Sequence, residues 1–150
     1  MLLLRMIFGK LELWQWILMA VVLIPSAVRD IRTKRINGFI CLVGILGALF
    51  VRERLLGESS QTLMKDLLPG VVTYVVAFFS DERIGKGDAV TLMFIGAVAG
   101  IETVLLSMFI SFSAAAALSA VLLMLKKVGK NTRLPFLPFL SLGVLAGGLL

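Results

Sequence analysis

Residues 89–125 read AVTLMFIGAVAGIETVLLSMFISFSAAAALSAVLLML, an apolar run that is broken only at Gly100 and Glu102. A helix needs roughly 20 apolar residues to cross a bilayer core of about 30 Å. The run is therefore too long for one membrane helix. We predict a short helix that ends near Gly100 and a second helix that begins at about Thr103.

Four other apolar segments complete the pattern, at residues 11–28, 36–51, 67–80 and 134–150, and a mixed-charge loop covers residues 52–66. Hydrophobic residues make up 59% of the sequence and charged residues only 16%, whereas about a quarter of a soluble domain is charged. The pattern predicts an all-α fold, a polytopic membrane bundle of about six transmembrane helices. We expect residues 1–150 to form a single domain.

The basic residues indicate how the bundle is oriented. Three clusters, at residues 29–37, 81–88 and 126–133, hold four, two and four of the fifteen Lys and Arg residues. Short loops rich in Lys and Arg stay in the cytoplasm. We therefore expect these clusters on the cytoplasmic side of the inner membrane, with both termini outside. The first apolar segment is long for a signal peptide, and we expect it to remain as the first helix.

Several kinds of chemistry are excluded by what the sequence lacks. It has no histidine and one cysteine, Cys41, so Ser-His-Asp and Cys-His pairs, HExxH zinc sites and an internal disulfide are all excluded. We expect no metal and no cofactor. The net charge of +6 does not indicate a nucleic-acid partner, because no aromatic residues alternate with the basic ones as base stacking requires.

Two carboxylates are the strongest candidates for chemistry. Asp30 follows the first apolar segment and Asp88 precedes the fourth, and both belong to the predicted cytoplasmic side. A carboxyl at the membrane boundary is partly desolvated, and two neighbouring carboxyls tend to share one proton. Such a pair can activate water with one member and polarise a peptide carbonyl with the other. Simpler interpretations stay open: Asp30 as a solvated loop acid, and Asp88 as a helix N-cap.

Asp88 ends the motif Gly85-Lys86-Gly87-Asp88. Glycines on both sides of one residue allow positive φ angles and close approach by another chain. An extended peptide substrate needs such access, and we expect Gly85 and Gly87 to shape the loop for it. Lys86 is either a solvated loop lysine or a charge that acts on Asp88 or on an acidic group of the substrate.

These motifs together resemble a known family. Asp30 followed by IRTKRIN at residues 31–37, the GKGD motif at residues 85–88 and LPFLPF at residues 134–139 are similar to blocks of the type IV prepilin peptidases. The resemblance implies a GxGD-type membrane aspartyl protease that removes a short, basic leader from prepilins or pseudopilins on the cytoplasmic side. It makes Asp30 and Asp88 the catalytic pair.

The sequence departs from that family at two places. Asn37 stands where the first block usually has proline, which leaves the role of Asn37 open. The paired CxxC motifs of the methylating members are absent, since Cys41 is the only cysteine. The resemblance thus implies the short, peptidase-only form found with Flp-type pili, without methyltransferase activity.

Two alternatives from other classes remain at this point. A small transporter or ion-translocating subunit could use Asp30 and Asp88 as ion sites, although such sites usually form near the bilayer midplane. A non-catalytic protein of pilus or secretion assembly could keep the same acids at an interface. The partners that we expect are a prepilin or pseudopilin, membrane lipid and, as an open candidate, a second copy of the chain.

Overall fold

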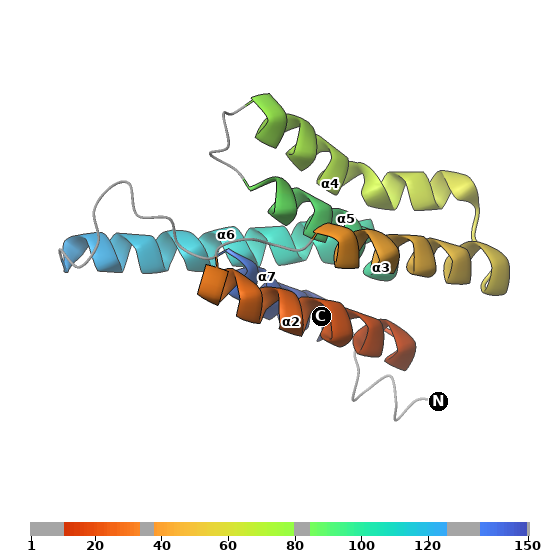
Figure 1. Ribbon diagram of the computed structural model, residues 1–150, viewed down its shortest axis with the longest axis horizontal. Helices are drawn as coiled ribbons and strands as arrows, with labels where there is room; N and C mark the ends of the chain where they lie inside the picture. The colour runs from red at the N-terminus through yellow and green to blue at the C-terminus, as the bar shows by residue number, and fades with distance from the viewer. Residues whose placement is uncertain (1–10, 34–37, 80–84, 126–135, 150) are drawn as a thin grey trace.

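The computed structural model describes residues 11–33, 38–79, 85–125 and 136–149, and the regular elements in these ranges are all helices. In chain order they are α2 (Leu13–Thr33), α3 (Gly38–Phe50), the π-helical turn η1 (Val51–Leu55), α4 (Ser60–Phe79), α5 (Lys86–Ala99), α6 (Ile101–Met124) and α7 (Leu137–Leu149) (Figure 1). The predicted all-α bundle is confirmed. The break near Gly100 is confirmed as well, because α5 ends just before this residue and α6 begins just after it.

The helix α4 begins seven residues earlier than the predicted start at Leu67. The Ser59 hydroxyl accepts a hydrogen bond from the backbone N–H of Thr62 at 3.3 Å, which is the contact of a helix N-cap. The last part of the predicted charged loop is therefore helical. Two of its charged residues, Arg52 in η1 and Asp66 in α4, are buried in the bundle, while the others stay partly or fully exposed.

The centre of the bundle is α5, which packs against α2, α3, α4, α6 and α7. Figure 1 shows this short helix lying between α4 and the pair formed by α2 and α7. Its side chains are buried on several faces, and Phe94, Ile95, Ala97 and Val98 have no exposed surface. A helix that is apolar all round belongs in a core. This explains why the sequence of α5 shows no clear polar face.

Two glycines let α4 and α5 approach until their backbones touch. A Cβ atom on Gly70 would lie 2.4 Å from the backbone nitrogen of Met93, and one on Gly96 would lie 2.1 Å from the carbonyl oxygen of Asp66. Small residues at helix crossings are typical of membrane bundles, where close packing replaces the hydrophobic effect. The contact fixes α5 against α4 over much of its length.

Three of the described helices contain stretches long and apolar enough to cross a membrane, namely Leu13–Arg32, Ser60–Phe79 and Ile101–Leu122. The helices α3, α5 and α7 have 13, 14 and 13 residues, so each rises only about 20 Å. Large apolar side chains cover the outside of the bundle, including Phe79, Phe109 and Met64. Lipid tails are the environment that such a surface fits.

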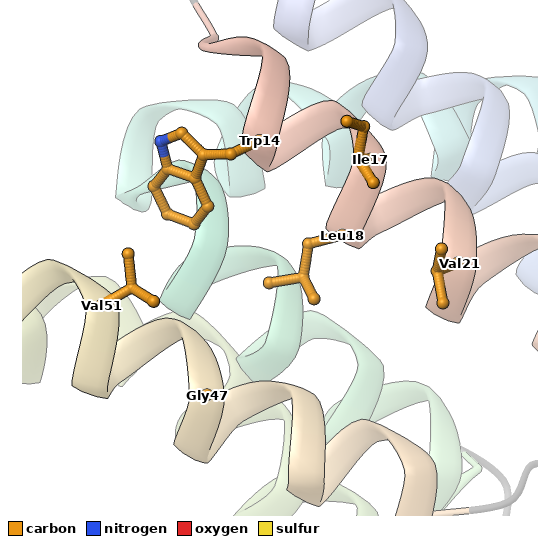
Figure 2. Close-up of a pocket in the computed structure, with 6 residues that line it drawn as sticks. All are labelled: Trp14, Ile17, Leu18, Val21, Gly47 and Val51. Atoms are coloured by element: carbon orange, nitrogen blue, oxygen red, sulfur yellow. The ribbon is translucent and has the colours of Figure 1, made fainter.

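A groove of about 360 Å³ lies on this outer surface between α2 and α3 (Figure 2). Its lining is almost wholly apolar, with Trp14, Ile17, Leu18, Val21, Gly47 and Val51. A Cβ atom on Gly47 would meet no atom within 4 Å, so the floor of the groove is open. None of these side chains carries an acid or a nucleophile, so the groove has no group for catalysis.

Candidate active site

Asp30 lies inside a helix and is buried. The helix α2 continues past the predicted end of its apolar segment to Thr33, which places Asp30 in its last turns, with only 6% of the residue exposed. One carboxylate oxygen, Oδ2, accepts a hydrogen bond of 3.1 Å from the backbone N–H of Leu137, the first residue of α7. This N–H has no partner within its own helix, and the positive end of the helix dipole favours an anion there. The interpretation of Asp30 as a solvated loop acid is therefore wrong.

Asp88 is the third residue of α5 and is partly buried. The N-cap of α5 is Gly85, and no side chain makes the capping hydrogen bond, so the interpretation of Asp88 as an N-cap is also wrong. Asp88 precedes the apolar run that starts at Ala89. Burial, and then the negative charge of Asp30, raise the pKa of Asp88 to about 7. The structure thus brings the two predicted acids, from α2 and α5, within electrostatic reach of each other.

The two glycines of the motif do not use the positive φ that glycine allows. Gly85 has φ −67° and ψ 123°, and Gly87 is part of α5. The described glycines with positive φ are Gly57 and Gly100. Gly85 is instead needed for space, because a Cβ atom there would lie 2.8 Å from Oδ2 of Asp88. The motif provides room for the carboxylate at a helix start.

Replacement of Gly85 by alanine tests this steric role. The new methyl group must displace the Asp88 carboxyl, and a shift of about 1 Å in a reacting group lowers rates roughly 100-fold. We expect a loss of that order in peptide cleavage with little change in thermal stability, because Gly85 is exposed. Gly47→Ala is the matched control, since its added methyl group meets open space. Equal activity of the two variants would contradict the steric argument.

The remaining candidate residues are Lys86 and Asn37. The Lys86 ammonium lies 5.8 Å from the centre of the Phe78 ring, a cation–π contact between the start of α5 and the end of α4. Lys86 is exposed. Asn37 lies outside the described residues. Among the residues that the structure describes, no group of three or more Cys, Asp or Glu side chains could hold a metal ion.

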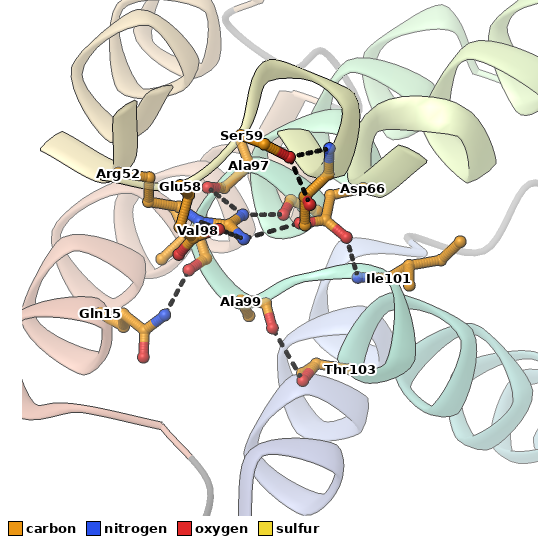
Figure 3. Close-up of polar contacts among 12 residues, drawn as sticks. Gln15, Arg52, Glu58, Ser59, Asp66, Ala97, Val98, Ala99, Ile101 and Thr103 are labelled. Carbon is orange, nitrogen blue, oxygen red and sulfur yellow. Dashed lines mark hydrogen bonds and ion pairs between the residues drawn. The ribbon is translucent and has the colours of Figure 1, made fainter. Parts of the chain in front are cut away.

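A buried charged cluster at the opposite end of α5 was missed by the sequence analysis (Figure 3). Arg52 and Asp66, which we placed in a mixed-charge loop, are only 6% and 4% exposed. Nη2 of Arg52 lies 2.7 Å from Oδ2 of Asp66, and Arg52 also forms an ion pair with Glu58. Charged residues at membrane depth are rare and usually paired. Their positions beside the apolar segments 36–51 and 67–80 were the available signal.

This cluster provides hydrogen-bond donors for the carbonyl groups at the C-terminal end of α5. The last four carbonyl groups of a helix lack partners within it. Here Gly96 accepts a hydrogen bond of 2.9 Å from the N–H of Gly100, and Nη1 of Arg52 donates to the carbonyl oxygens of Gly96 and Ala97 at 3.3 and 3.1 Å. The remaining two are bound by Nε2 of Gln15, which donates to Val98 at 2.6 Å, and by Oγ1 of Thr103, which donates to Ala99 at 3.2 Å. All four carbonyl groups are thus satisfied inside the bundle.

Asp66 provides the matching hydrogen-bond acceptor at the start of the next helix, α6. Its Oδ1 accepts a hydrogen bond of 2.9 Å from the N–H of Ile101, the first residue of α6. Gly100, between the two helices, has φ 85°, a left-handed conformation that suits glycine. One ion pair therefore fixes both sides of the corner between α5 and α6. Its role is structural, because it lies at the far end of α5 from Asp88.

An all-helical bundle with membrane-length helices and two carboxyls from α2 and α5 at one site defines a polytopic membrane protein with the groups needed for acid–base hydrolysis. The sequence profile described as the Type IV leader peptidase family matches residues 17–120, which include Asp30, Asp88 and the GKGD motif. The chain belongs to this family. Comparisons with curated proteins and with solved structures gave no match.

Proposed function

We propose that this protein is a membrane aspartyl endopeptidase that removes the basic leader from type IV, Flp-like prepilins or pseudopilins. It acts at the cytoplasmic face of the inner membrane and does not methylate the product. The observation that carries the proposal is the pairing of Asp30 and Asp88, with the pKa of Asp88 raised to about 7. The family match supports peptidase chemistry in general.

The two acids have different surroundings, which suggests a division of roles. Asp30 accepts a hydrogen bond from the Leu137 N–H at the positive end of α7, and we assign it the role of the base. Asp88 holds a proton near neutral pH. Asp30 takes a proton from water as the water oxygen attacks the scissile carbonyl carbon, and Asp88 donates its proton to the carbonyl oxygen. The gem-diol intermediate then breaks its C–N bond: the proton held by Asp30 passes to the leaving amine, and one hydroxyl proton of the intermediate returns to Asp88, which leaves a carboxylic acid and both acids in their starting forms.

This assignment predicts how cleavage depends on pH. The pKa of Asp88 is raised, so its acid form is present below about pH 7 and is lost as the pH rises. The rate of leader cleavage should fall by about tenfold for each pH unit well above this value. The measurement is the rate of cleavage of one prepilin in detergent micelles between pH 6 and 9. A rate that rises through this range would contradict the role of Asp88 as the acid.

The proposal as a whole is tested with a substrate. We would co-express the protein with a Flp-type prepilin and follow loss of the leader by mass spectrometry of the pilin amino terminus. We expect cleavage with the wild type and none with Asp30→Asn/Asp88→Asn, each produced at the same level in the membrane. Cleavage that persists in the double variant would overturn the proposal.

A further inference from the structure

The N–H group that Asp30 binds belongs to the first residue of α7, so the position of α7 decides whether this contact forms. Leu137 is 1% exposed, and its backbone nitrogen lies 3.1 Å from Oδ2 of Asp30. A hydrogen bond weakens steeply as its length grows and its angle closes. A shift of α7 by about 1 Å would therefore break the contact, although Asp30 itself lies on α2.

Glycine lets α7 lie directly on the backbone of α6. A Cβ atom on Gly143 would lie 2.5 Å from the carbonyl oxygen of Ser107 and would also overlap Oγ of Ser111. Four residues later on the same face, a Cβ atom on Gly147 would lie 3.2 Å from Oγ of Ser107 and 3.4 Å from the carbonyl oxygen of Thr103. The Ser107 carbonyl group is part of the helix backbone and cannot rotate away. Gly143 is therefore the position at which a side chain fits least.

An aromatic contact holds the residue that precedes α7. The carbonyl oxygen of Phe136 accepts the N–H of Leu140 at 3.0 Å and so begins the hydrogen bonding of the helix. The Phe136 ring stacks on Phe112 of α6, with the ring centres 5.1 Å apart and the planes 25° from parallel. Offset stacking of this kind stabilises an aromatic pair beyond the area that it buries. The residue next to Leu137 is thus fixed from α6 as well.

The two contacts hold α7 at different points along its axis. Phe136 is the neighbour of Leu137, whereas Gly143 lies six residues further on, about 9 Å along the helix. Two separate contacts restrict both sliding and tilting of a stiff helix. Another side of α7 packs on α2, where a Cβ atom on Gly148 would lie 2.9 Å from the Trp16 ring. A displacement of α7 from α6 therefore also disturbs its contact with α2.

We propose that Phe112 and Gly143 are positioning residues, which hold α7 against α6 so that the Leu137 N–H meets Asp30. Both act on Asp30 through α7. The inference rests on the proposed function for its purpose, because it makes the placement of the base depend on α6. The placement itself is a claim about geometry that is independent of peptidase activity.

Alkylation of a single thiol at position 30 tests the geometry. The reference protein is Asp30→Cys/Cys41→Ser, in which the introduced thiol is the only one. Position 30 is 6% exposed, so we expect this thiol to react slowly with N-ethylmaleimide in membranes and fast in denaturant. Gly143→Ala, added to the reference protein, forces α7 away from α6. It should speed alkylation about tenfold, an effect typical of an overpacked core.

The matched control for general loss of stability is Leu63→Ala. Leu63 is a buried residue of α4, and its truncation weakens the core at another helix. We expect the alkylation rate of the reference protein to stay unchanged. Equal rates for Gly143→Ala and the reference protein would overturn the inference. An equal increase in Leu63→Ala would overturn it as well, because the bundle would then loosen as a whole.

Phe112→Leu is a second variant that removes a contact without overpacking the bundle. It should speed alkylation of the reference protein about threefold, in keeping with the loss of one aromatic pair. Phe109→Leu is its matched control, since Phe109 lies on the same helix and is 72% exposed, and we expect no change. Equal rates for the two variants would overturn the role of Phe112.

Activity provides the second readout, in the chain with Asp30 intact. Gly143→Ala should lower kcat for prepilin cleavage about tenfold with KM unchanged, which corresponds to one lost hydrogen bond to a charged group, and Leu63→Ala should leave kcat of the folded protein unchanged. If the wild type cleaves no prepilin while the alkylation rates behave as expected, the proposed function fails and the positioning claim stands. If Gly143→Ala changes neither kcat nor the alkylation rate, the positioning claim fails alone.

Discussion

Asp30→Asn and Asp88→Asn are each expected to lower the rate of leader cleavage by roughly 10²- to 10⁴-fold, the contribution of a positioned acid or base. Their effects on stability should differ. The amide of Asp30→Asn keeps an acceptor for the Leu137 N–H but loses the negative charge at the start of α7, so we expect a loss of about 1 kcal/mol. A fall in cleavage rate that is much larger than the loss of stability explains would show that the acids do more than stabilise the fold.

Asp88→Asn should have the opposite effect on stability, and the size of this effect should depend on pH. The pKa of Asp88 is raised from 3.8 to about 7, so its stabilising contribution is greatest below pH 3.8 and is lost as the pH rises to about 7. At pH 8 the charged form destabilises the fold. Replacement by a neutral amide should therefore raise the thermal unfolding temperature at pH 8 and leave it almost unchanged at pH 4.

Both variants are measured by thermal unfolding in detergent and by prepilin cleavage, beside Glu53→Gln. Glu53 is an exposed acid in η1, and its replacement should change neither property. An Asp88→Asn protein that is less stable than the wild type at pH 8 would contradict the burial argument. Normal cleavage by either single variant would contradict the pairing.

Arg52→Met is expected to cost about 3–5 kcal/mol of stability, the largest stability effect that we predict. The substitution leaves the buried Asp66 carboxylate without its partner at 2.7 Å and removes the donor to Gly96 and Ala97. An uncompensated charge inside the bundle is more costly than the loss of an ion pair as a whole. The corner at Gly100 should loosen, and α5 should become the least protected helix in hydrogen exchange.

A double-mutant cycle separates these contributions. Asp66→Asn added to Arg52→Met removes the unpaired charge while it keeps an oxygen for the Ile101 N–H, so the double variant should be more stable than Arg52→Met alone. Arg54→Met is the matched control, since Arg54 belongs to the same turn but is exposed, and we expect a change below about 0.5 kcal/mol. Similar losses for Arg52→Met and Arg54→Met would contradict the capping role of Arg52.

The fold class could be predicted from the sequence because apolar length and charge clustering are local properties. The break at Gly100 was visible for the same reason. The start of α4 was not, because Ser60 and the two residues after it are polar, and the Ser59 cap that begins the helix is a contact of the folded chain. Hydropathy cannot distinguish a solvated loop from a helix whose charges are paired inside the bundle.

The two acids were found in the sequence by their position at segment ends, and their catalytic role stays a prediction. The hydrogen-bond partners and the burial of these acids could not be predicted from the sequence. The donor to Asp30 is Leu137, 107 residues away, and the burial that raises the pKa of Asp88 comes from the packing of the bundle around the start of α5. Gly85 illustrates the same limit: the motif indicated a special residue, but the reason is the space that Asp88 occupies and not the φ angle.

The hydrogen bond from Leu137 to Asp30 also has a consequence for biosynthesis. Ribosomes make the chain from its amino terminus, so α2 and α5 enter the membrane well before α7 is complete. Until Leu137 arrives, Asp30 lacks its backbone donor, and the protein carries both acids without a finished site. The surroundings of Asp30 are therefore complete only once the last described helix has packed against α2.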